Sequence, residues 1–204
     1  MKSVQKVSDK LKKIWISNTL RGARHINDYK NVCLNMLYMV NDPWRMESPQ
    51  EQYRFTETNR IILKEFKQVG SLLEIGCGEG HQSIHLKQIC GHLTGLDMSA
   101  RAVKRAKRRC PDCEFLVGDI FSQELDVRVP FDLVVACEVI YYMSEVPAAL
   151  RRIQALGRNC FVTYYAGVME NLDPQALSLS GAVSEILEFN QSRWRAVWWR
   201  NDYV

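Results

Sequence analysis

The stretch that decides the fold is Leu72-Leu73-Glu74-Ile75-Gly76-Cys77-Gly78-Glu79-Gly80. A short apolar run leads into three alternating glycines. Such a run, stopped by glycines, is typical of a buried parallel strand that turns tightly into a helix. Glycine is used where the backbone turns sharply or approaches a ligand closely. Because open α/β sheets bind nucleotides at the carboxyl end of such a strand, the stretch predicts a nucleotide site there.

The spacing of the glycines narrows the class of nucleotide. A dinucleotide fingerprint would place its third glycine at position 81, where the chain has His81. A phosphate-binding loop would need Gly-Lys-Ser/Thr, which does not follow these glycines. The pattern from Glu74 to Gly80 instead resembles motif I of the class I S-adenosylmethionine (SAM) methyltransferases. A plain glycine-rich loop is the alternative interpretation.

Strands and helices are expected to alternate along the rest of the chain. The predicted strands are 92–97, 114–117, 131–137 and 160–165, the helices 81–90, 100–110 and 144–156, and a closing hairpin pairs 183–189 with 193–200. A helix over 175–190 competes with that hairpin. The fold class is therefore α/β, a doubly wound Rossmann-like, mostly parallel sheet with a C-terminal antiparallel hairpin. The class I methyltransferases that the chain resembles end in the same way.

Two parts of the chain are expected. Residues 1–47 form a predicted N-terminal helical appendage or lid, and residues 48–204 a predicted SAM-dependent methyltransferase domain. Lysines and apolar residues at helical spacing over 2–15 predict a basic amphipathic helix packed on the domain, with a membrane or nucleic-acid contact as the alternative. Residues 38–45 carry a tryptophan, and we expect them to close over the site as a lid.

The domain is expected to open with a helix. Ser48, Pro49 and Glu51 predict a capping box with proline at the first helical position. The helix should continue to about Lys67, because Gly70 follows shortly. Its apolar side chains should face the sheet.

The resemblance to class I SAM methyltransferases implies a role for three acids. Glu74 belongs to motif I, at the methionine end of the cofactor. Asp97 matches the acid that binds the ribose hydroxyls, since a carboxylate accepts from both at once. Asp119 matches the group that meets the adenine amino group, and Ile120 would cover the adenine face. The cofactor is thus SAM, its product S-adenosylhomocysteine, and the expected cofactor-binding residues are Glu74, Gly76, Cys77, Gly78, Gly80, Asp97, Met98, Asp119, Ile120 and Cys137, with Tyr53 or Arg60 at the cofactor carboxylate.

A narrower resemblance rests on short motifs. Asn41-Asp42-Pro43-Trp44-Arg45, then Ser48 and Glu51, then Glu138-Val139-Ile140-Tyr141-Tyr142 are similar to the nodulation-protein S methyltransferases. That resemblance implies methylation of an amino-sugar nitrogen on a chito-oligosaccharide. Phe131–Tyr142 also matches motif IV, which delivers side chains to the methyl group.

The motif IV block supplies candidates for the chemistry. A carboxylate beside aromatic faces suits a cationic amine, so a small amine is the expected acceptor. Glu138 is expected to contact the acceptor or the cofactor edge, with a structural cap as its alternative, and His81 could be a base or only a helix-start residue. The expected catalytic residues are Glu138, Tyr142 and His81, and the expected substrate-binding residues are Trp44, Tyr141 and Tyr142.

Composition limits the alternatives. The chain has 204 residues and a net charge of +4, far below that of a dedicated nucleic-acid binder. It contains no apolar run of roughly 18 residues that would predict a membrane span, and its seven scattered cysteines favour a reducing cytoplasm. Cys110 and Cys113 form a single C-x-x-C pair without the further ligands of a zinc site, so no metal is expected.

Several functions stay open beside amine methylation: O-methylation of a small molecule, RNA methylation and non-catalytic SAM binding. The metal-dependent small-RNA methyltransferases continue the acid of motif IV as E-x-x-E-H, whereas here Glu138 is followed by Tyr141 and Tyr142. The expected partner is a small-molecule acceptor, with neither nucleic acid nor membrane, and the chain is expected to be a monomer or homodimer.

Overall fold

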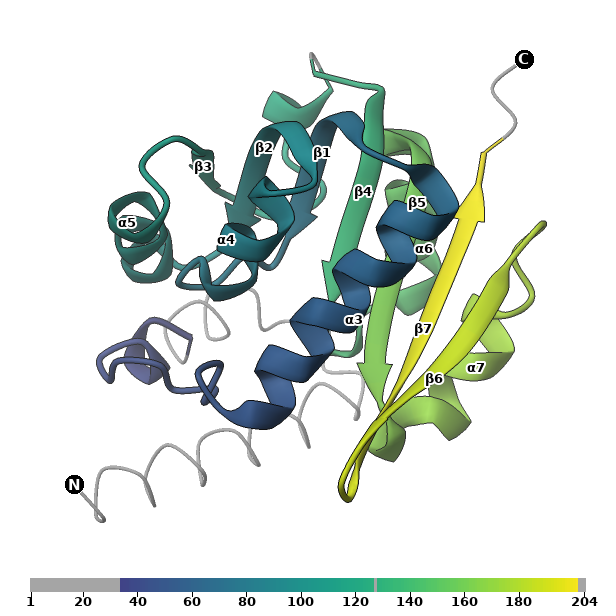
Figure 1. Cartoon of the computed structure of the whole chain (residues 1–204). Helices are drawn as coiled ribbons and strands as arrows, with labels where there is room; N and C mark the ends of the chain where they lie inside the picture. The colour runs from purple at the N-terminus through teal and green to yellow at the C-terminus, as the bar shows by residue number, and fades with distance from the viewer. Residues whose placement is uncertain (1–33, 127, 202–204) are drawn as a thin grey trace.

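A seven-stranded sheet organises residues 34–126 and 128–201, which are the residues that the computed structural model describes (Figure 1). The strand order is β3-β2-β1-β4-β5-β7-β6. The strands are β1 Val69–Ile75, β2 Cys90–Asp97, β3 Glu114–Val117, β4 Phe131–Cys137, β5 Gly157–Tyr165, β6 Val183–Phe189 and β7 Ser192–Arg200. The helices are α3 Pro49–Phe66, α4 His81–Lys87, α5 Ala100–Arg109, α6 Val146–Leu156 and α7 Met169–Ala176, with short 3-10 helices at Gln123–Leu125, Ile140–Tyr142 and Ala166–Val168.

The first five strands run parallel, and β7 is inserted antiparallel between β5 and β6. The predicted fold class is thus confirmed, including the closing hairpin. The competing helix over 175–190 is wrong, because helix α7 ends at Ala176 and 183–189 form strand β6. The predicted basic helix over residues 2–15 lies outside the described residues.

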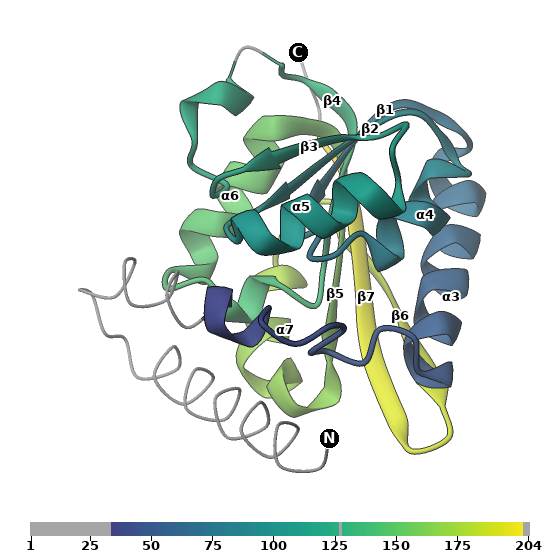
Figure 2. The same ribbon diagram turned by 90° about the vertical axis from the view of Figure 1, so that its left-hand side faces the viewer.

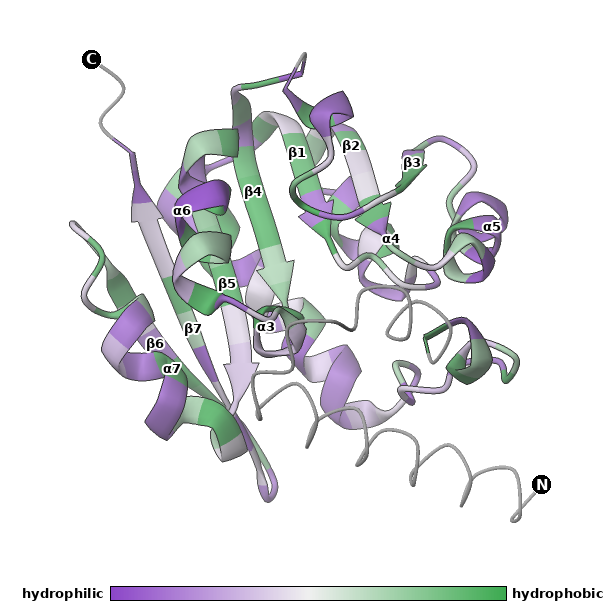
Figure 3. Cartoon of the chain, turned by 180° about the vertical axis from the view of Figure 1, so that it is seen from behind, coloured by the Kyte–Doolittle hydropathy of each residue, from purple (hydrophilic) through white to green (hydrophobic). Residues whose placement is uncertain are grey.

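Two apolar layers cover the sheet, one on each face, because successive side chains of a strand point to opposite faces. Leu72 and Trp198 pack in the layer with α3, α4 and α5, whereas their neighbours Leu73 and Trp199 pack with α6 and α7. Figure 2 shows α3 and α4 on one side of the sheet and α6 on the other, and Figure 3 shows α6 and α7 from behind. Burial on both faces explains the nearly continuous apolar runs of the central strands.

The starts of two helices follow from their sequences. Ser99 caps α5, because its hydroxyl accepts a hydrogen bond from the backbone N–H of Ala102 at 3.3 Å. Ser48 is the residue before α3 and Pro49 its first helical residue, as predicted. The predicted capping box does not form, since the Ser48 side chain makes no capping bond and Glu51 instead accepts from Arg54 at 2.8 Å.

Helix α7 was not among the expected helices. It contains Pro174, a residue that removes a backbone donor and usually interrupts a helix. Tertiary contacts hold it: Asp173 accepts from the Tyr164 hydroxyl at 2.7 Å and pairs with Arg195 at 2.9 Å. These partners lie on β5 and β7, so the chain tethers the helix to the sheet across long sequence distances.

The C-x-x-C cysteines and the lengths of the helices relate to the expectations of no metal site and no membrane span. The thiols of Cys110 and Cys113 are buried and lie 3.2 Å apart as free cysteines just after α5. Among the helices of the described ranges, none is both long enough and apolar enough to cross a membrane.

Candidate active site

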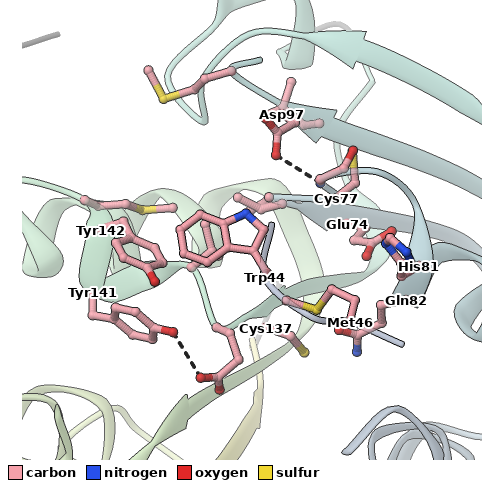
Figure 4. A pocket seen from close by; sticks show the side chains of 18 of the residues that line it. Trp44, Met46, Glu74, Cys77, His81, Gln82, Asp97, Cys137, Tyr141 and Tyr142 are labelled. Atoms are coloured by element: carbon pink, nitrogen blue, oxygen red, sulfur yellow. Dashed lines mark hydrogen bonds between the residues drawn. The ribbon is translucent and has the colours of Figure 1, made fainter. Parts of the chain in front are cut away.

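A cavity of about 880 Å³ opens at the carboxyl ends of the parallel strands (Figure 4). That end of an open α/β sheet is where such folds bind their ligands. Residues at or after the ends of β1, β2, β3 and β4 line it, together with parts of residues 34–46 and with residues 191–194, where the β6–β7 turn leads into β7. Its volume lies within the usual range for ligand sites.

The motif I turn has the conformation that its glycines predicted. Gly76 and Gly78 have φ of 73° and 53°, in the left-handed region that side chains disfavour. A Cβ on Gly78 would lie 3.0 Å from the Tyr38 hydroxyl, and one on Gly76 would lie 2.5 Å from Val139. Both glycines, and Cys77 between them, line the cavity. The missing side chains therefore leave room where the backbone faces the cavity.

Glu74 is buried at the end of β1 and faces the cavity. It accepts a hydrogen bond from the Ser83 hydroxyl at 2.5 Å. Burial raises the pKa of Glu74 to about 8, against the opposing effects of Ser83 and Arg54. The carboxyl therefore favours its protonated form at neutral pH.

Asp97 ends β2, as predicted, and both of its oxygens face backbone donors. Oδ2 accepts from the Gly78 N–H at 2.9 Å and Oδ1 from the Ser99 N–H at 2.8 Å. Burial raises the pKa of Asp97 to about 6, while those two hydrogen bonds oppose it. The motif I turn and the acid of β2 are thus joined directly, and Met98 beside them also lines the cavity.

Asp119 and Ile120 follow β3 and line the same cavity. Asp119 accepts from the Phe121 N–H at 2.7 Å, which fixes the loop. Ile120 is buried and presents an apolar surface beside it. The three acids that the sequence singled out after β1, β2 and β3 therefore meet in one place.

Glu138 follows β4 with a φ of 57°, an uncommon conformation for a residue with a side chain. Its carboxylate accepts from the Tyr141 hydroxyl at 3.0 Å and from the Thr163 hydroxyl at 3.0 Å. Burial raises the pKa of Glu138 to about 7, and the positive charge of Arg54 opposes this shift. Glu138 is thus an oriented carboxyl poised to titrate near neutral pH.

Aromatic rings form a continuous series beside Glu138. The Trp44 and Tyr142 centroids lie 5.7 Å apart, those of Tyr142 and Tyr141 4.4 Å, and those of Tyr141 and Tyr165 5.3 Å. All four rings line the cavity, and Figure 4 shows the indole of Trp44 facing Tyr142. The chain therefore surrounds a buried carboxylate with aromatic faces.

His81 also reaches the cavity, at the start of α4. Burial, followed by the charge of Arg109, lowers the pKa of His81, so its ring favours the neutral form. Its Nε2 lies 3.7 Å from a Glu47 oxygen and makes no hydrogen bond within the described residues. Cys137, at the end of β4, is the remaining predicted residue that lines the cavity.

Three predicted site residues lie elsewhere. Arg60 is 41% exposed and pairs with Glu57 and Glu185, and Tyr53 packs against Phe189 with centroids 5.0 Å apart. Gly80 lies against α5, since a Cβ there would come within 3.1 Å of the Ala106 backbone. None of the three lines the cavity in the described structure, so their predicted contacts with the cofactor are corrected.

Arg54 is the cation that the sequence analysis missed. It is 1% exposed, lines the cavity, donates to Glu51 at 2.8 Å and to Gln82 at 3.0 Å. The helical period of α3 could have revealed it, because Arg54 shares the buried stripe of Phe55, Thr58, Ile61 and Ile62. Arg60 lies off that stripe.

These residues fit SAM. The turn at Gly76 and Gly78 leaves backbone bare, Asp97 offers a carboxylate for vicinal hydroxyls, and Ile120 offers an apolar face beside Asp119. Arg54 supplies a buried positive charge near motif I, where a cofactor carboxylate would need one. The donor and acceptor set thus matches each chemical part of the cofactor.

Comparison with known families agrees with this fit. The family model described as "Nodulation protein S (NodS)" matches residues 27–200. Nodulation protein S of Bradyrhizobium diazoefficiens is 28% identical over 160 residues, which cover 75% of each protein. That of Sinorhizobium fredii is 30% identical over 127 residues, 60% of this chain and 56% of the relative. Ubiquinone biosynthesis O-methyltransferase of Rhodopseudomonas palustris is 30% identical over 113 residues, 54% of this chain and 45% of the relative.

Solved structures share the fold. The N-methyltransferase NodS of Bradyrhizobium japonicum WM9, in complex with S-adenosylhomocysteine, superposes with a TM-score of 0.68 at 24% identity, over 85% of this chain and 98% of that one. Magnesium protoporphyrin IX methyltransferase of Synechocystis PCC 6803, with bound SAM, gives 0.58 at 17% identity, over 79% and 85%. With its family model matched over residues 27–200, the chain belongs to the nodulation protein S family of SAM-dependent methyltransferases.

Proposed function

We propose that this methyltransferase transfers the methyl group of SAM to the amine nitrogen of a small acceptor, an amino sugar being the favoured class. The observation that carries the proposal is Glu138, a buried carboxyl at the cavity that is held by Tyr141 and Thr163. An amine needs a partner that orients its N–H bonds, and a carboxylate accepts them. The neighbouring rings of Tyr142 and Trp44 would stabilise positive charge on the nitrogen.

The positions of the residues in the cavity suggest a chemical role for each of them. SAM supplies a methyl group that its sulfonium already activates for transfer. Glu138 accepts an N–H of the acceptor and turns the nitrogen lone pair toward the methyl group. As the nitrogen gains the methyl group it also gains positive charge, which Glu138 offsets, and the carboxylate can take the proton that the product releases. Tyr141 and Thr163 fix the carboxylate, and the aromatic series excludes water.

A relative supports the choice of nitrogen. The NodS protein of Bradyrhizobium japonicum is an N-methyltransferase, and nodulation protein S of Bradyrhizobium diazoefficiens aligns over three quarters of both chains. The chain spans about half the length of two other nodulation S relatives, 56% and 48%. The acceptor of this protein is therefore proposed from the site together with the family.

O-methylation is the second candidate. The ubiquinone biosynthesis O-methyltransferases of Rhodopseudomonas palustris are similar over 113 residues, and a hydroxyl acceptor would need a base. His81, whose pKa is lowered by burial, and Glu138 could each serve as that base. RNA methylation and non-catalytic SAM binding have no comparable support from the cavity.

A product assay distinguishes these functions. Labelled SAM would be supplied with a panel of de-N-acetylated chito-oligosaccharides, simple amines, phenols, carboxylic acids and total RNA, and the methylated atom identified by mass spectrometry and NMR. Label on a nitrogen of a small acceptor is expected. Label only on oxygen, or only in RNA, would defeat the proposal, and binding of S-adenosylhomocysteine without any product would indicate a non-catalytic protein.

We also propose a cellular location, an oligomeric state and a division into domains for this enzyme. We expect a cytoplasmic enzyme, because the seven cysteines follow no disulfide framework, which favours a reducing compartment. A monomer or homodimer is expected. Residues 1–47 as a lid and 48–204 as the catalytic domain remain predictions, although residues 34–46 contribute to the cavity wall.

A further inference from the structure

A buried carboxylate of the motif I turn, Glu79, helps to fasten residues 34–47 to the domain, beside hydrogen bonds from Ser99 to Asn35 at 2.7 Å and from Gln52 to the backbone oxygen of Met46 at 2.8 Å. The Glu79 side chain is only 3% exposed. One oxygen accepts from the backbone N–H of Asp42 at 2.8 Å, and the other accepts from the Arg105 guanidinium. Arg105 also donates to the backbone oxygen of Val40 at 2.9 Å. Both residues of the Glu79–Arg105 ion pair therefore hydrogen-bond to the backbone of residues 34–47.

The turn that Glu79 holds has a defined shape. Asp42 has a φ of 44°, and its carboxylate accepts from the N–H groups of Met46 at 2.6 Å and Glu47 at 3.1 Å. Arg109 of α5 donates to the backbone oxygen of Glu79. Although the ligating atoms of Asp42, Glu79 and His81 lie within 4.8 Å of one another, hydrogen bonds from the chain already reach both carboxylates. We therefore interpret Asp42 and Glu79 as residues that hold residues 34–47 in place through hydrogen bonds and not as metal ligands.

The fastened segment carries two side chains of the cavity wall. Tyr38 is 3% exposed and packs beside Gly78, and its hydroxyl accepts from Trp44 Nε1 at 3.1 Å. Burial and the nearby Asp97 raise the pKa of Tyr38, so the hydroxyl keeps its own proton available as a donor. Trp44 continues the wall to Tyr142. The segment therefore spans the cavity from the Asp97 side to the Glu138 side.

We propose that Glu79 and Arg105 are positioning residues for the cofactor, acting by holding Tyr38 and Trp44 against the motif I turn. Glu79 lies between Gly78 and Gly80, so the turn that meets the cofactor also binds the segment that covers it. A motif I turn that is ordered by bound cofactor favours docking of residues 34–47, and the docked segment in turn favours cofactor binding. The inference concerns the cofactor and does not depend on which acceptor the enzyme uses.

The test compares Arg105→Gln with Arg101→Gln, an exposed arginine on the same helix that lines no part of the cavity. Titration calorimetry should show that Arg105→Gln raises the dissociation constant of S-adenosylhomocysteine about ten-fold or more, the usual effect of losing a charge-assisted hydrogen bond. Hydrogen exchange should become faster in residues 34–47 and stay unchanged in β4. Saturating S-adenosylhomocysteine should restore part of the lost protection.

Two further variants separate positioning from a general loss of stability. Glu79→Gln should act in the same direction, and the double variant should be less than additive, because both changes remove one interaction. Arg105→Lys keeps the charge but carries it on a flexible side chain without the planar guanidinium, so its effect should be intermediate. Unchanged cofactor affinity in Arg105→Gln and Glu79→Gln would overturn the proposal. Equal gains of exchange in 34–47 and β4 would overturn it too.

Discussion

At the scale of single residues, Glu138 makes the sharpest prediction. Glu138→Gln keeps the shape and loses the charge, so turnover should fall about ten- to a hundred-fold, as expected for the loss of an acid–base or charge-assisted contact. Affinity for S-adenosylhomocysteine should change little, because the loss falls on the acceptor side. Turnover of the unaltered enzyme should rise with pH through about 7, where Glu138 loses its proton.

Steady-state kinetics from pH 5.5 to 8.5, with Glu170→Gln as control, check this prediction. Glu170 is exposed and lines no part of the cavity, so its variant should behave as the unaltered enzyme does. If Glu138→Gln retained full turnover with the same pH profile, Glu138 would be a structural cap of the β4 end and nothing more.

Asp97 provides the corresponding prediction for the cofactor. Asp97→Asn removes the negative charge that the ribose hydroxyls would meet, so the dissociation constant of S-adenosylhomocysteine should rise about ten- to a hundred-fold. Asparagine has one acceptor oxygen, so it can keep one of the two hydrogen bonds from Gly78 and Ser99 and loses the other. Calorimetry checks the affinity, with the exposed Asp112→Asn as the matched control. An unchanged affinity would remove Asp97 from the ribose site.

Residues set by the motif were predictable, and residues set by packing were not. Glu74, Asp97 and Glu138 end strands, so sequence alone places them at the same edge of the sheet. Arg54 and Glu79 are different. Arg54 has Glu51 three residues away on the same helix, but its amide partner Gln82 lies far along the chain. Glu79 is held by Arg105, which lies on another helix. No local pattern shows the distant partners Gln82 and Arg105, although helical phase would have preferred Arg54 to Arg60.

At the scale of elements, the β6–β7 turn is the unexpected wall of the cavity. Residues 191–194 line it, and Trp194 pairs with Tyr165 in the sheet, so we propose that this part of the wall contacts the acceptor. Gln191→Ala should therefore raise the acceptor KM about two- to ten-fold, the loss of one neutral hydrogen bond, and leave cofactor affinity unchanged. Gln88→Ala, exposed and outside the cavity, serves as the control.

Kinetics with varied acceptor at saturating SAM check this prediction, together with a panel of acceptors of increasing length. An acceptor KM that does not move, while SAM affinity falls, would instead assign the turn to the cofactor. Such a result would leave Glu138 as the acceptor contact and require the acceptor to enter between residues 34–46 and Tyr142.

The elements themselves were predictable to different degrees. Strands β1 to β5 were foreseen because apolar runs of their length, bounded by glycine and acids, have few other solutions. Helix α7 was missed because Pro174 argues locally against it, whereas tertiary contacts stabilise it: Leu172 and Ala176 are buried in the core, and Asp173 bonds to Tyr164 and Arg195. The hairpin was foreseen, yet its use as a cavity wall depends on where β7 is inserted in the sheet.

At the scale of the whole molecule, the cavity is assembled from parts far apart in the sequence. Residues 34–46, the ends of four parallel strands and the turn at 191–194 meet there. Pattern and periodicity predict each part separately, and the family resemblance supplied their assembly. The sequence does not encode in any local form that the first and last of these segments line one cavity, since this depends on strand order.

The assembly concentrates three buried carboxyls whose pKa values burial raises: Glu74 to about 8, Glu138 to about 7 and Asp97 to about 6. Between about pH 4, where such groups titrate in an unfolded chain, and pH 8, these three carboxyls hold more protons in the folded state than in the unfolded state. Their contribution to the free energy of unfolding therefore falls as pH rises through this window. A separation of one pH unit between folded and unfolded pKa corresponds to about 1.4 kcal/mol.

Glu74→Gln isolates the largest of these contributions. Glutamine does not titrate, so the free energy of unfolding of the unaltered protein should fall more steeply from about pH 5 to pH 8 than that of the variant. The lowered pKa values of His81 and His85 act with the opposite sign, and they cancel in the difference because both proteins contain them. Urea unfolding at a series of pH values measures the difference, with the exposed Glu124→Gln as control. Parallel curves for the protein and Glu74→Gln would mean that Glu74 is ionised in the folded state, held by Arg54, and that the motif I acid enters the site as a negative charge.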